Sequence, residues 1–320
     1  MEACIIVTYR CNAKCHMCNT WQFPTKPAEE ITAETVDKLP TGLDFINITG
    51  GEPFLRQDLD KIIEIALKKT KRLVISSNGY FTERMVALGR KFPQIGVRIS
   101  IEGLPAANDK LRGIRDGFDH GLRSLIELKN LGIKDLGFGM TVSDANAKDM
   151  IELYRLADSM GLEFATASTH NSYYFHKLDN TFHDPEMIAG EFEKISCELL
   201  KTNRPKNWFR AYFNHGMANY VRGGRRLLPC EVGTDMFFVD PWGRIMPCNG
   251  MDCEMSMGDL TKQSFDEIWN SEQAKSVRET VQCCEKSCWM IGSVAPAMKK
   301  DIMTPLKWIL KHKFGFGNGF

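Results

Sequence analysis

Short apolar runs alternate with amphipathic stretches through the first half of this chain. The apolar runs have the length of buried strands, and the stretches between them carry apolar residues at helical spacing. The predicted strands are 4–8, 43–48, 73–77, 96–101, 136–142 and 163–168. The predicted helices between them are 33–39, 59–69, 83–91, 122–131 and 149–160. Regular alternation of this kind indicates parallel βαβ units.

No predicted strand is followed by the Gly-rich loop of a dinucleotide-binding sheet. We therefore expect an α/β fold of the barrel type, a partial (β/α)6 TIM-like barrel, in preference to an open Rossmann sheet. In such a barrel the chemistry lies at the carboxyl ends of the strands.

The pattern changes after about residue 180. Further helices are predicted over 184–202, 207–221 and 265–281. Two short runs flank an Asp-Pro-Trp-Gly turn and predict a hairpin of strands 236–239 and 244–246. We expect three parts, namely the barrel over 1–200, a small C-terminal α+β domain over 201–295 and a basic, aromatic tail over 296–320.

Charges of the two signs nearly balance, with 41 Lys and Arg against 40 Asp and Glu. This argues against a nucleic-acid binder, which needs a strong basic excess. No apolar run approaches the ~18–20 residues of a membrane-spanning helix. The first residues also lack a basic region followed by a long apolar stretch, so we expect no secretory signal and a cytoplasmic location.

Eleven cysteines are unusual for a chain expected in a reducing compartment, where clustered thiolates are typical metal ligands. Cys11, Cys15 and Cys18 form a C-x3-C-x2-C loop just after the first predicted strand. Three thiolates suit three irons of a cubane cluster and leave the fourth iron open. A structural zinc site would need a fourth protein ligand.

The chain resembles the radical SAM superfamily in this loop and in three further motifs. These are Gly-Gly-Glu-Pro at 50–53, Ser-Ser-Asn-Gly at 76–79 and Ser-Ile-Glu-Gly at 100–103, each at the carboxyl end of a predicted strand. The resemblance implies that Cys11, Cys15 and Cys18 hold a [4Fe-4S] cluster and that S-adenosylmethionine (SAM) chelates its open iron. It also implies reductive cleavage of SAM to a 5′-deoxyadenosyl radical, which abstracts hydrogen from an unactivated C–H bond.

The same resemblance places further residues around SAM. It implies that Gly50 and Gly51 allow close backbone approach to the SAM amino group and that Glu52 accepts its hydrogen bonds. The other implied contacts are Ser100 to the ribose, Arg112 to the carboxylate, Met140 or Thr141 to the adenosyl group, and Asn78 in the same cavity. Residue 17 is usually aromatic in the family and is Met17 here, so we expect a softer contact with adenine.

A second group of cysteines surrounds the predicted hairpin and follows the last predicted helix. The spacing alone leaves a structural zinc ion or a further iron–sulfur cluster open. This region, about 228–290, resembles the SPASM/twitch extension of radical SAM enzymes, with its C-x(9–15)-G-x4-C start. The seven-cysteine block of the full SPASM form is incomplete, so the resemblance implies one auxiliary [4Fe-4S] cluster. The expected ligands are Cys230, Cys248, Cys284 and Cys288, with Cys253 or Cys283 able to replace one of the last two. Cys197 is expected in the core of a helix interface.

No motif in the sequence identifies the substrate. The preferred hypothesis is oxidation or epimerisation of a carbohydrate-like or other small polyol, because single-cluster twitch enzymes include such dehydrogenases. The chain as given begins at the first barrel strand, which also favours a small molecule. Epimerisation needs a hydrogen-atom donor, and Cys253 is the candidate for that role, although we favour a bystander and a cluster ligand is the other alternative. The alternative hypothesis is a peptide or protein maturase that installs a side-chain crosslink.

A cluster-bearing scaffold without SAM chemistry is disfavoured by Glu52 and Ser100 beside the three-cysteine loop. The polar, aromatic loop over 165–177 is a candidate substrate contact or an ordinary loop. An electron donor such as flavodoxin or ferredoxin is expected as a partner. The basic tail can either pack as a helix on the barrel or make peripheral contact with a membrane.

Overall fold

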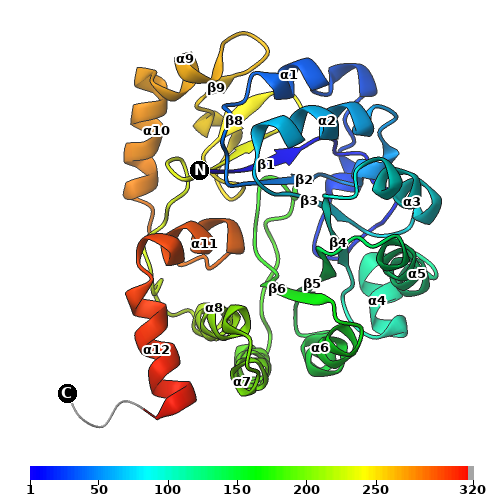
Figure 1. Cartoon of the computed structure of the whole chain (residues 1–320). Helices are drawn as coiled ribbons and strands as arrows, with labels where there is room; N and C mark the ends of the chain where they lie inside the picture. Colours follow the sequence, from blue (N-terminus) through cyan, green and yellow to red (C-terminus); the bar gives the residue numbers. More distant parts are fainter. Residues whose placement is uncertain (316–320) are drawn as a thin grey trace.

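The sheet of this molecule is continuous from the barrel into the C-terminal part (Figure 1). The computed structural model describes residues 1–315, apart from the side chain of Cys253. Within this range nine strands pair in the order β6-β5-β4-β3-β2-β1-β7-β8-β9. The strands are β1 (Glu2–Ile6), β2 (Phe45–Thr49), β3 (Leu73–Ser77), β4 (Gly96–Ser100), β5 (Leu136–Val142), β6 (Glu163–Ser168), β7 (Met236–Val239), β8 (Arg244–Met246) and β9 (Gly258–Asp259). Neighbours from β6 to β7 are parallel, and β8 and β9 are antiparallel.

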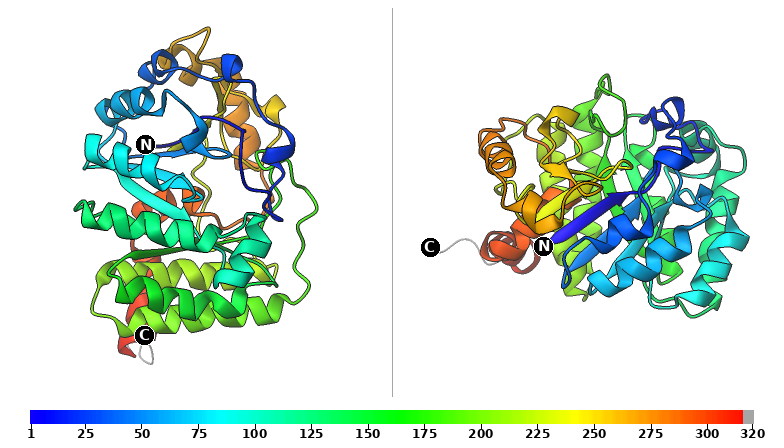
Figure 2. Two further views of the ribbon diagram at one scale, coloured as in Figure 1. Left: turned by 90° about the vertical axis from the view of Figure 1, so that its right-hand side faces the viewer. Right: turned by 90° about the horizontal axis from the view of Figure 1, so that it is seen from above.

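Helices cover the outer face of the parallel strands, as Figures 1 and 2 show. The barrel helices are α1 (Ala33–Asp37), α2 (Leu59–Lys69), α3 (Thr82–Lys91), α4 (Pro105–Arg112), α5 (Gly117–Asn130), α6 (Met150–Ser159), α7 (Pro185–Lys201) and α8 (Pro205–Val221). The C-terminal helices are α9 (Phe265–Trp269), α10 (Glu272–Gln282), α11 (Ile291–Lys300) and α12 (Met303–Phe314). The predicted partial barrel is thus confirmed.

Several element boundaries differ from the sequence-based expectation. The predicted helix over 265–281 was wrong, since it is two helices, α9 and α10. The chain breaks there because the Ser271 hydroxyl accepts a hydrogen bond from the Ala274 N–H at 3.0 Å and caps the start of α10. Strand β1 begins two residues earlier than predicted, and helix α4 was not predicted at all.

The barrel wall has two distinct faces. Val97 and Ile99 of β4, like Phe138 of β5, are buried in the main hydrophobic core beneath the helices. Arg98 and Ser100 alternate with them and are only half-buried. Since successive side chains of a strand point to opposite faces, this second set faces the barrel interior.

The C-terminal hairpin adds to the barrel sheet through β7, which pairs with β1 from Glu2↔Met236 to Ile5↔Val239. Helix α12 packs on the barrel helix α8, where the Trp308 ring stacks 4.9 Å from His215. The predicted tail is therefore a packed helix up to Phe314, and Phe316 and Phe320 lie outside the described residues. Contact of this segment with a membrane stays a prediction. Within residues 1–315, none of the helices has the length and apolar character that crossing a bilayer requires.

Gly216 on α8 leaves room for Trp289, which follows the last cysteine, to pack against this helix. A Cβ on Gly216 would lie 2.1 Å from the Trp289 indole, which is 1% exposed. We expect Gly216→Ala to destabilise the protein by about 1–3 kcal/mol through overpacking. A thermal unfolding curve measures this.

The matched control is Gly190→Ala on α7, because a Cβ there meets no atom within 4 Å. It should leave the protein unchanged or stabilise it by about 0.5–1 kcal/mol, since alanine is the better helix former. Equal unfolding temperatures for the two variants would contradict the assigned role of Gly216.

Candidate active site

The three-cysteine loop lies at the carboxyl end of β1 and is held from below by backbone contacts with α4. The Lys14 N–H donates to the Arg112 carbonyl at 2.9 Å, and the His16 N–H donates to the Leu111 carbonyl at 2.8 Å. Gly113 ends α4 with φ of 57°, and a Cβ there would lie 2.6 Å from the Lys14 carbonyl oxygen. This junction needs glycine both for its backbone conformation and for the close approach.

The thiols of this loop fit an iron–sulfur cluster. Cys11, Cys15 and Cys18 are half-buried, and burial raises the pKa of Cys11 to about 12, with the neighbouring Ala13 N–H and the Cys15 thiol as further influences. Burial also raises the pKa of Cys15, which the guanidinium of Arg112 opposes. No three described His, Cys, Asp or Glu side chains are close enough to hold a single metal ion. Three thiolates on one loop suit three irons of a cubane cluster, whereas a structural zinc site usually has four protein ligands.

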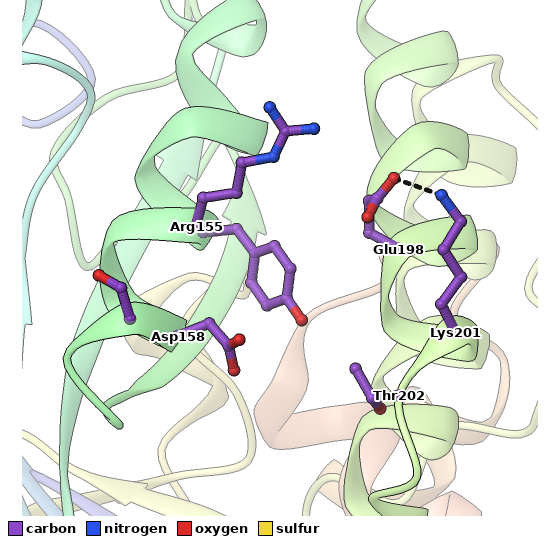
Figure 3. Close-up of a pocket in the computed structure, with 7 residues that line it drawn as sticks. Arg155, Asp158, Glu198, Lys201 and Thr202 are labelled. Carbon is purple, nitrogen blue, oxygen red and sulfur yellow. Dashed lines mark hydrogen bonds and ion pairs between the residues drawn. The ribbon is translucent and has the colours of Figure 1, made fainter.

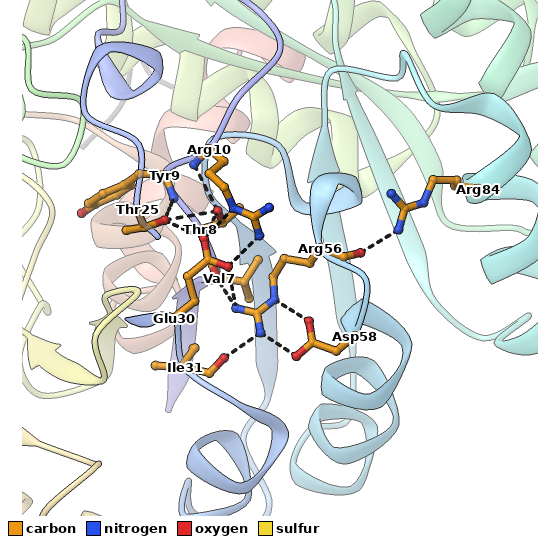
Figure 4. A network of polar contacts seen from close by, with 10 residues as sticks. All are labelled: Val7, Thr8, Tyr9, Arg10, Thr25, Glu30, Ile31, Arg56, Asp58 and Arg84. Atoms are coloured by element: carbon orange, nitrogen blue, oxygen red, sulfur yellow. Dashed lines mark hydrogen bonds and ion pairs between the residues drawn. The ribbon is translucent and has the colours of Figure 1, made fainter. Parts of the chain in front are cut away.

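A buried network of charged and hydroxyl groups supports the loop where it leaves β1 (Figure 4). The Glu30 side chain is 1% exposed and accepts hydrogen bonds from Thr8 and Thr25, the latter at 2.6 Å. Arg10, next to Cys11, binds the same carboxylate through two nitrogens at 2.8 and 2.9 Å. Burial raises the pKa of Glu30, but the Arg10 and threonine hydrogen bonds outweigh it, so the pKa is lowered overall.

Gly50 and Gly51 contact the backbone of the cysteine loop. A Cβ on Gly50 would lie 2.4 Å from the Thr8 carbonyl oxygen, and one on Gly51 would lie 2.3 Å from that of Arg10. The Gly51 N–H donates to Thr8 at 2.7 Å, and the Glu52 N–H donates to Arg10 at 2.8 Å. The close approach expected at these glycines is therefore made, in this structure, to the chain's own loop.

Glu52 is fully buried at the junction of β2 and β3. Its carboxylate accepts hydrogen bonds from the Ser77 hydroxyl at 2.9 Å, the Asn78 N–H at 2.8 Å and the Phe54 N–H at 3.1 Å. Burial is the largest influence on its pKa and raises it, against these hydrogen bonds. The Asn78 amide in turn donates to Asn12 in the cysteine loop at 2.8 Å, so it braces that loop.

Arg112 makes an ion pair that the sequence did not predict. Its guanidinium donates to the Glu102 carboxylate at 2.8 Å, and both side chains are buried. Glu102 also accepts the Thr141 N–H at 2.5 Å. The Arg112 Nε is buried and has no hydrogen-bond partner among the described residues, which leaves one donor for a bound anion. A signal was present, since Glu102 stands in the Ser-Ile-Glu-Gly motif and Arg112 follows ten residues later.

The other residues predicted to contact SAM differ in which face of the barrel sheet they lie on. Met140 is 1% exposed in the main hydrophobic core, which favours Thr141 of the two alternatives, and the contact with the adenosyl group stays a prediction. Thr141 alternates with it and is half-buried toward the interior, as is Ser100 at the end of β4. Met17 is half-buried within the cysteine loop.

Four of the C-terminal cysteines gather beside the hairpin. Burial raises the pKa of Cys248 to about 11, and the nearby thiols of Cys288 and Cys230 add to the shift. Burial also raises the pKa of Cys288, where Arg226 opposes and Cys230 and Cys284 add to the effect. These four are the expected auxiliary ligands; their thiols influence one another electrostatically, and the ligand assignment stays a prediction.

Two other cysteines of the described residues are exposed. Cys283 is exposed at the end of α10. Cys197 is exposed on α7, so the expectation of a core position was wrong. Cys253 begins a 3-10 turn (Cys253–Met255), but its side chain lies outside the described part of the structure, and its three possible roles stay predictions.

The loop after β6 joins the two cysteine groups. The Asn19 N–H, next to Cys18, donates to the Phe175 carbonyl at 2.7 Å. Beside Cys248, the Asn249 carbonyl accepts the Ser172 hydroxyl at 2.6 Å. The Tyr174 hydroxyl donates to the Gly50 carbonyl at 2.9 Å, so this tyrosine is engaged within the protein. The loop therefore has a structural role, and its contact with a substrate stays a prediction.

The pocket in Figure 3 lies on the outer surface, between α6 and α7, and has a volume of about 340 Å³. Arg155, Asp158, Glu198 and Lys201 line it, and the last two form an ion pair of 2.7 Å. It contains no cysteine and lies at the end of α6 that leads into the start of β6. It is separate from the site at the carboxyl ends of the strands.

Fold and site together define an iron–sulfur enzyme built on a partial barrel. Comparison with known sequences agrees, since the profile of the Radical SAM superfamily matches residues 5–157 and that of SPASM, an iron–sulfur cluster-binding domain, matches residues 230–289. Pre-heme d1 synthase of Dinoroseobacter shibae is 32% identical over 302 residues, covering 82% of this chain and 71% of that protein. The chain belongs to the radical SAM superfamily and carries a SPASM domain.

Other similar proteins differ in how much of their length is matched. Fe-coproporphyrin III synthase of Methanosarcina barkeri is 33% identical over 160 residues, and the match spans 48% of this chain and 39% of that protein. The subtilosin biosynthesis protein AlbA of Bacillus subtilis is 24% identical over 91% of this chain and 66% of its own. Among solved structures, anSMEcpe with bound AdoMet has a TM-score of 0.67, 13% identity and coverage of 98% and 99% of the two chains.

Streptococcus suis SuiB bound to S-adenosylmethionine has a TM-score of 0.66 and 14% identity over 90% of this chain and 72% of its own. These likenesses show the same fold. The barrel domain of this superfamily binds a [4Fe-4S] cluster and SAM, and the SPASM domain binds auxiliary iron–sulfur clusters.

We expect about eight iron and eight sulfide per chain after anaerobic reconstitution, four for each [4Fe-4S] cluster. Changing Cys11, Cys15 and Cys18 together to Ala should leave about four, by iron and sulfide assay. Cys197→Ala is the control, because this exposed thiol lies on α7 away from both groups. A wild type that never exceeds about four iron would count against the auxiliary cluster.

Glu30→Gln should destabilise the protein by about 3–5 kcal/mol, because it leaves buried arginine charge without its partner. It should also lower cluster retention at the adjacent loop. Since the pKa of Glu30 is depressed, its stabilisation is present above the ordinary glutamate pKa and is lost as the pH falls through the folded-state value. Thermal unfolding with iron analysis measures both effects.

Glu29→Gln is the matched control, since Glu29 is 46% exposed and forms a surface ion pair with Lys26. Its stability and iron content should equal those of the wild type. If Glu30→Gln behaves in the same way as this control, the network does not support the loop.

Proposed function

We propose that this protein is an oxidoreductase that removes a hydrogen atom from a small polar molecule held inside the barrel. The observation that carries the proposal is the meeting of three half-buried thiols with two buried carboxylates, Glu52 and Glu102, at the carboxyl ends of the strands. When bound, the cluster and SAM supply a 5′-deoxyadenosyl radical by one-electron cleavage of SAM. A reduced flavodoxin or ferredoxin would supply that electron.

The chain's own residues would bind and orient SAM. Both carboxylate oxygens of Glu52 accept hydrogen bonds, Oε1 from Ser77 and Phe54 and Oε2 from Asn78, and Oε2 would accept the SAM amino group on its remaining lone pair. The free Nε of Arg112 would meet the SAM carboxylate, while Glu102 holds the guanidinium in place. Ser100 and Thr141 would contact the ribose and adenosyl groups from the interior face.

The interior wall supports a substrate rich in hydroxyl groups. Asn47, Thr49, Ser76, Ser100 and Thr141 are half-buried on this face and carry neutral hydrogen-bonding groups. Such a lining matches a carbohydrate-like or other small polyol, which the enzyme would oxidise or epimerise. In the oxidation, the auxiliary cluster held by Cys230, Cys248, Cys284 and Cys288 would accept the second electron.

The relatives support a second candidate, modification of a larger substrate. AlbA is a protein of bacteriocin biosynthesis, and anSMEcpe has been solved with a bound peptide, which favours a peptide maturase. Pre-heme d1 synthase and Fe-coproporphyrin III synthase favour a tetrapyrrole instead. Supplying a polyol, a peptide and a coproporphyrin to the reconstituted enzyme distinguishes these classes, because the true substrate accelerates formation of 5′-deoxyadenosine.

The reduced wild type should cleave SAM to methionine and 5′-deoxyadenosine even without substrate, measured by chromatography. Glu52→Gln should raise the KM for SAM by about 10- to 100-fold, because it removes a charge-assisted hydrogen bond worth about 1.5–3 kcal/mol. Glu83→Gln, an exposed substitution on α3, should leave the KM unchanged. Both variants must retain the iron content of the wild type for the comparison to be valid. An unchanged KM for SAM in Glu52→Gln would show that Glu52 does not recognise SAM.

A further inference from the structure

Six charged side chains meet at the amino ends of the barrel strands, opposite the cysteine loop. Arg72 precedes β3, Asp135 precedes β5, Glu163 begins β6 and Arg98 lies within β4. Lys206 and Arg210 reach the same place from α8. None of these residues belongs to a motif that the sequence singled out.

Each carboxylate of this group is shared between two cations. Asp135 pairs with Arg72 at 2.7 Å and with Arg98 at 2.6 Å. Glu163 pairs with Lys206 at 3.0 Å and also with Arg210. Four cations therefore face two carboxylates, and the group has an excess of two positive charges.

Burial and mutual repulsion make this excess of positive charge energetically unfavourable. Burial lowers the pKa of Arg210 to about 10, and the nearby guanidinium groups of Arg98 and Arg72 lower it further. Burial also lowers the pKa of Lys206, again with Arg72 and Arg98 adding to the shift. A group of mutually repelling, partly desolvated cations is stabilised by an additional anion.

Open space lies above this group on the interior face. Arg98, Gly137 and Glu163 are register partners across β4, β5 and β6 and share one face of the sheet. The next row upward is Ser100, Gly139 and Ala165. A Cβ on Gly139 would meet no atom within 4 Å, so there is open space before this glycine at the level of Ser100, whereas a Cβ on Gly137, in the charged row, would lie 2.4 Å from the Glu163 carbonyl oxygen.

We propose that Arg98, Arg210 and their neighbours bind an anionic group of the substrate, a carboxylate or a phosphate, while its reacting end points up toward the cysteine loop. This rests on the proposed function and adds the substrate class to it. Arginine side chains suit both anions because their planar donors bind two oxygens at once.

The length of the interior agrees with this orientation. Arg98 stands two residues before Ser100 on β4. At about 3.3 Å per residue, its Cα lies about 7 Å below the level at which the SAM ribose is expected. A substrate of sugar-acid, sugar-phosphate or carboxylated tetrapyrrole size would span the distance, so a neutral polyol becomes the less favoured substrate.

The test uses the reconstituted holoenzyme with two probes, inorganic phosphate and glutarate. Their binding is measured as a shift in unfolding temperature and by titration calorimetry, against chloride at equal ionic strength. Arg210→Gln removes a cation from the group, and Glu163→Gln removes an anion from the same ion pair. Arg123→Gln, an exposed substitution on α5, is the matched control for charge.

The wild type should bind at least one probe, and Arg210→Gln should weaken that binding about tenfold or more, as expected for loss of a hydrogen bond to a charged group. Glu163→Gln should bind as well as the wild type or more tightly, and Arg123→Gln should be unchanged. A response to phosphate alone or to glutarate alone identifies the anion. If Arg210→Gln does not fold, Lys206→Met, at a side chain 58% exposed, replaces it and should show the same direction of change.

Absence of binding in the wild type, or equal binding in the wild type and the cation variants, would overturn the proposal. Equal loss in Arg210→Gln and Glu163→Gln would also overturn it, because a purely structural ion pair predicts that result. SAM cleavage without substrate is measured on the same samples. If the enzyme cleaves SAM but binds neither anion, only this inference is contradicted. If it binds an anion but does not cleave SAM, only the proposed function is contradicted.

Discussion

The contact on which the site depends is the packing of two backbones with no side chain between them. Gly50 and Gly51, at the end of β2, lie against Thr8 and Arg10, at the start of the cysteine loop. Because a methyl group would come within 2.4 Å of a carbonyl oxygen at either glycine, any other residue would push the loop away from the strand ends. The position of all three thiols follows from this contact and from the matching one at Gly113.

Buried charged side chains also hold the cysteine loop and its surroundings in place. Glu30 holds Arg10 beneath the loop, Glu52 collects donors from the ends of β2 and β3, and Glu102 holds Arg112. Each carboxylate takes hydrogen bonds from at least two different segments of the chain, so the desolvation of one charge is offset by several donors. The result is a rigid polar frame in which few groups, notably the Arg112 Nε, are left for a ligand.

The two metal-binding regions are structurally one unit. Strand β7 pairs with β1, so the hairpin between Cys230 and Cys248 continues the sheet that carries the first cysteine loop. The loop after β6 adds direct hydrogen bonds to residues beside Cys18 and Cys248. A fixed relation between the two clusters is what an electron transfer from substrate to auxiliary cluster would need.

The sequence alone predicts the strand and helix alternation, the bounds of β3, β5, β6 and α2, and the cysteines and motifs of the family, because local periodicity and short spacings encode them. The three-dimensional fold was needed to show that Met140 faces the core and Thr141 the interior, that Arg112 pairs with Glu102, and that Arg98 and Arg210 share the base of the barrel. The physical reason is that facing and pairing depend on sheet register and on packing between residues far apart in the chain, such as Arg98 and Arg210, and no local pattern encodes such a distance.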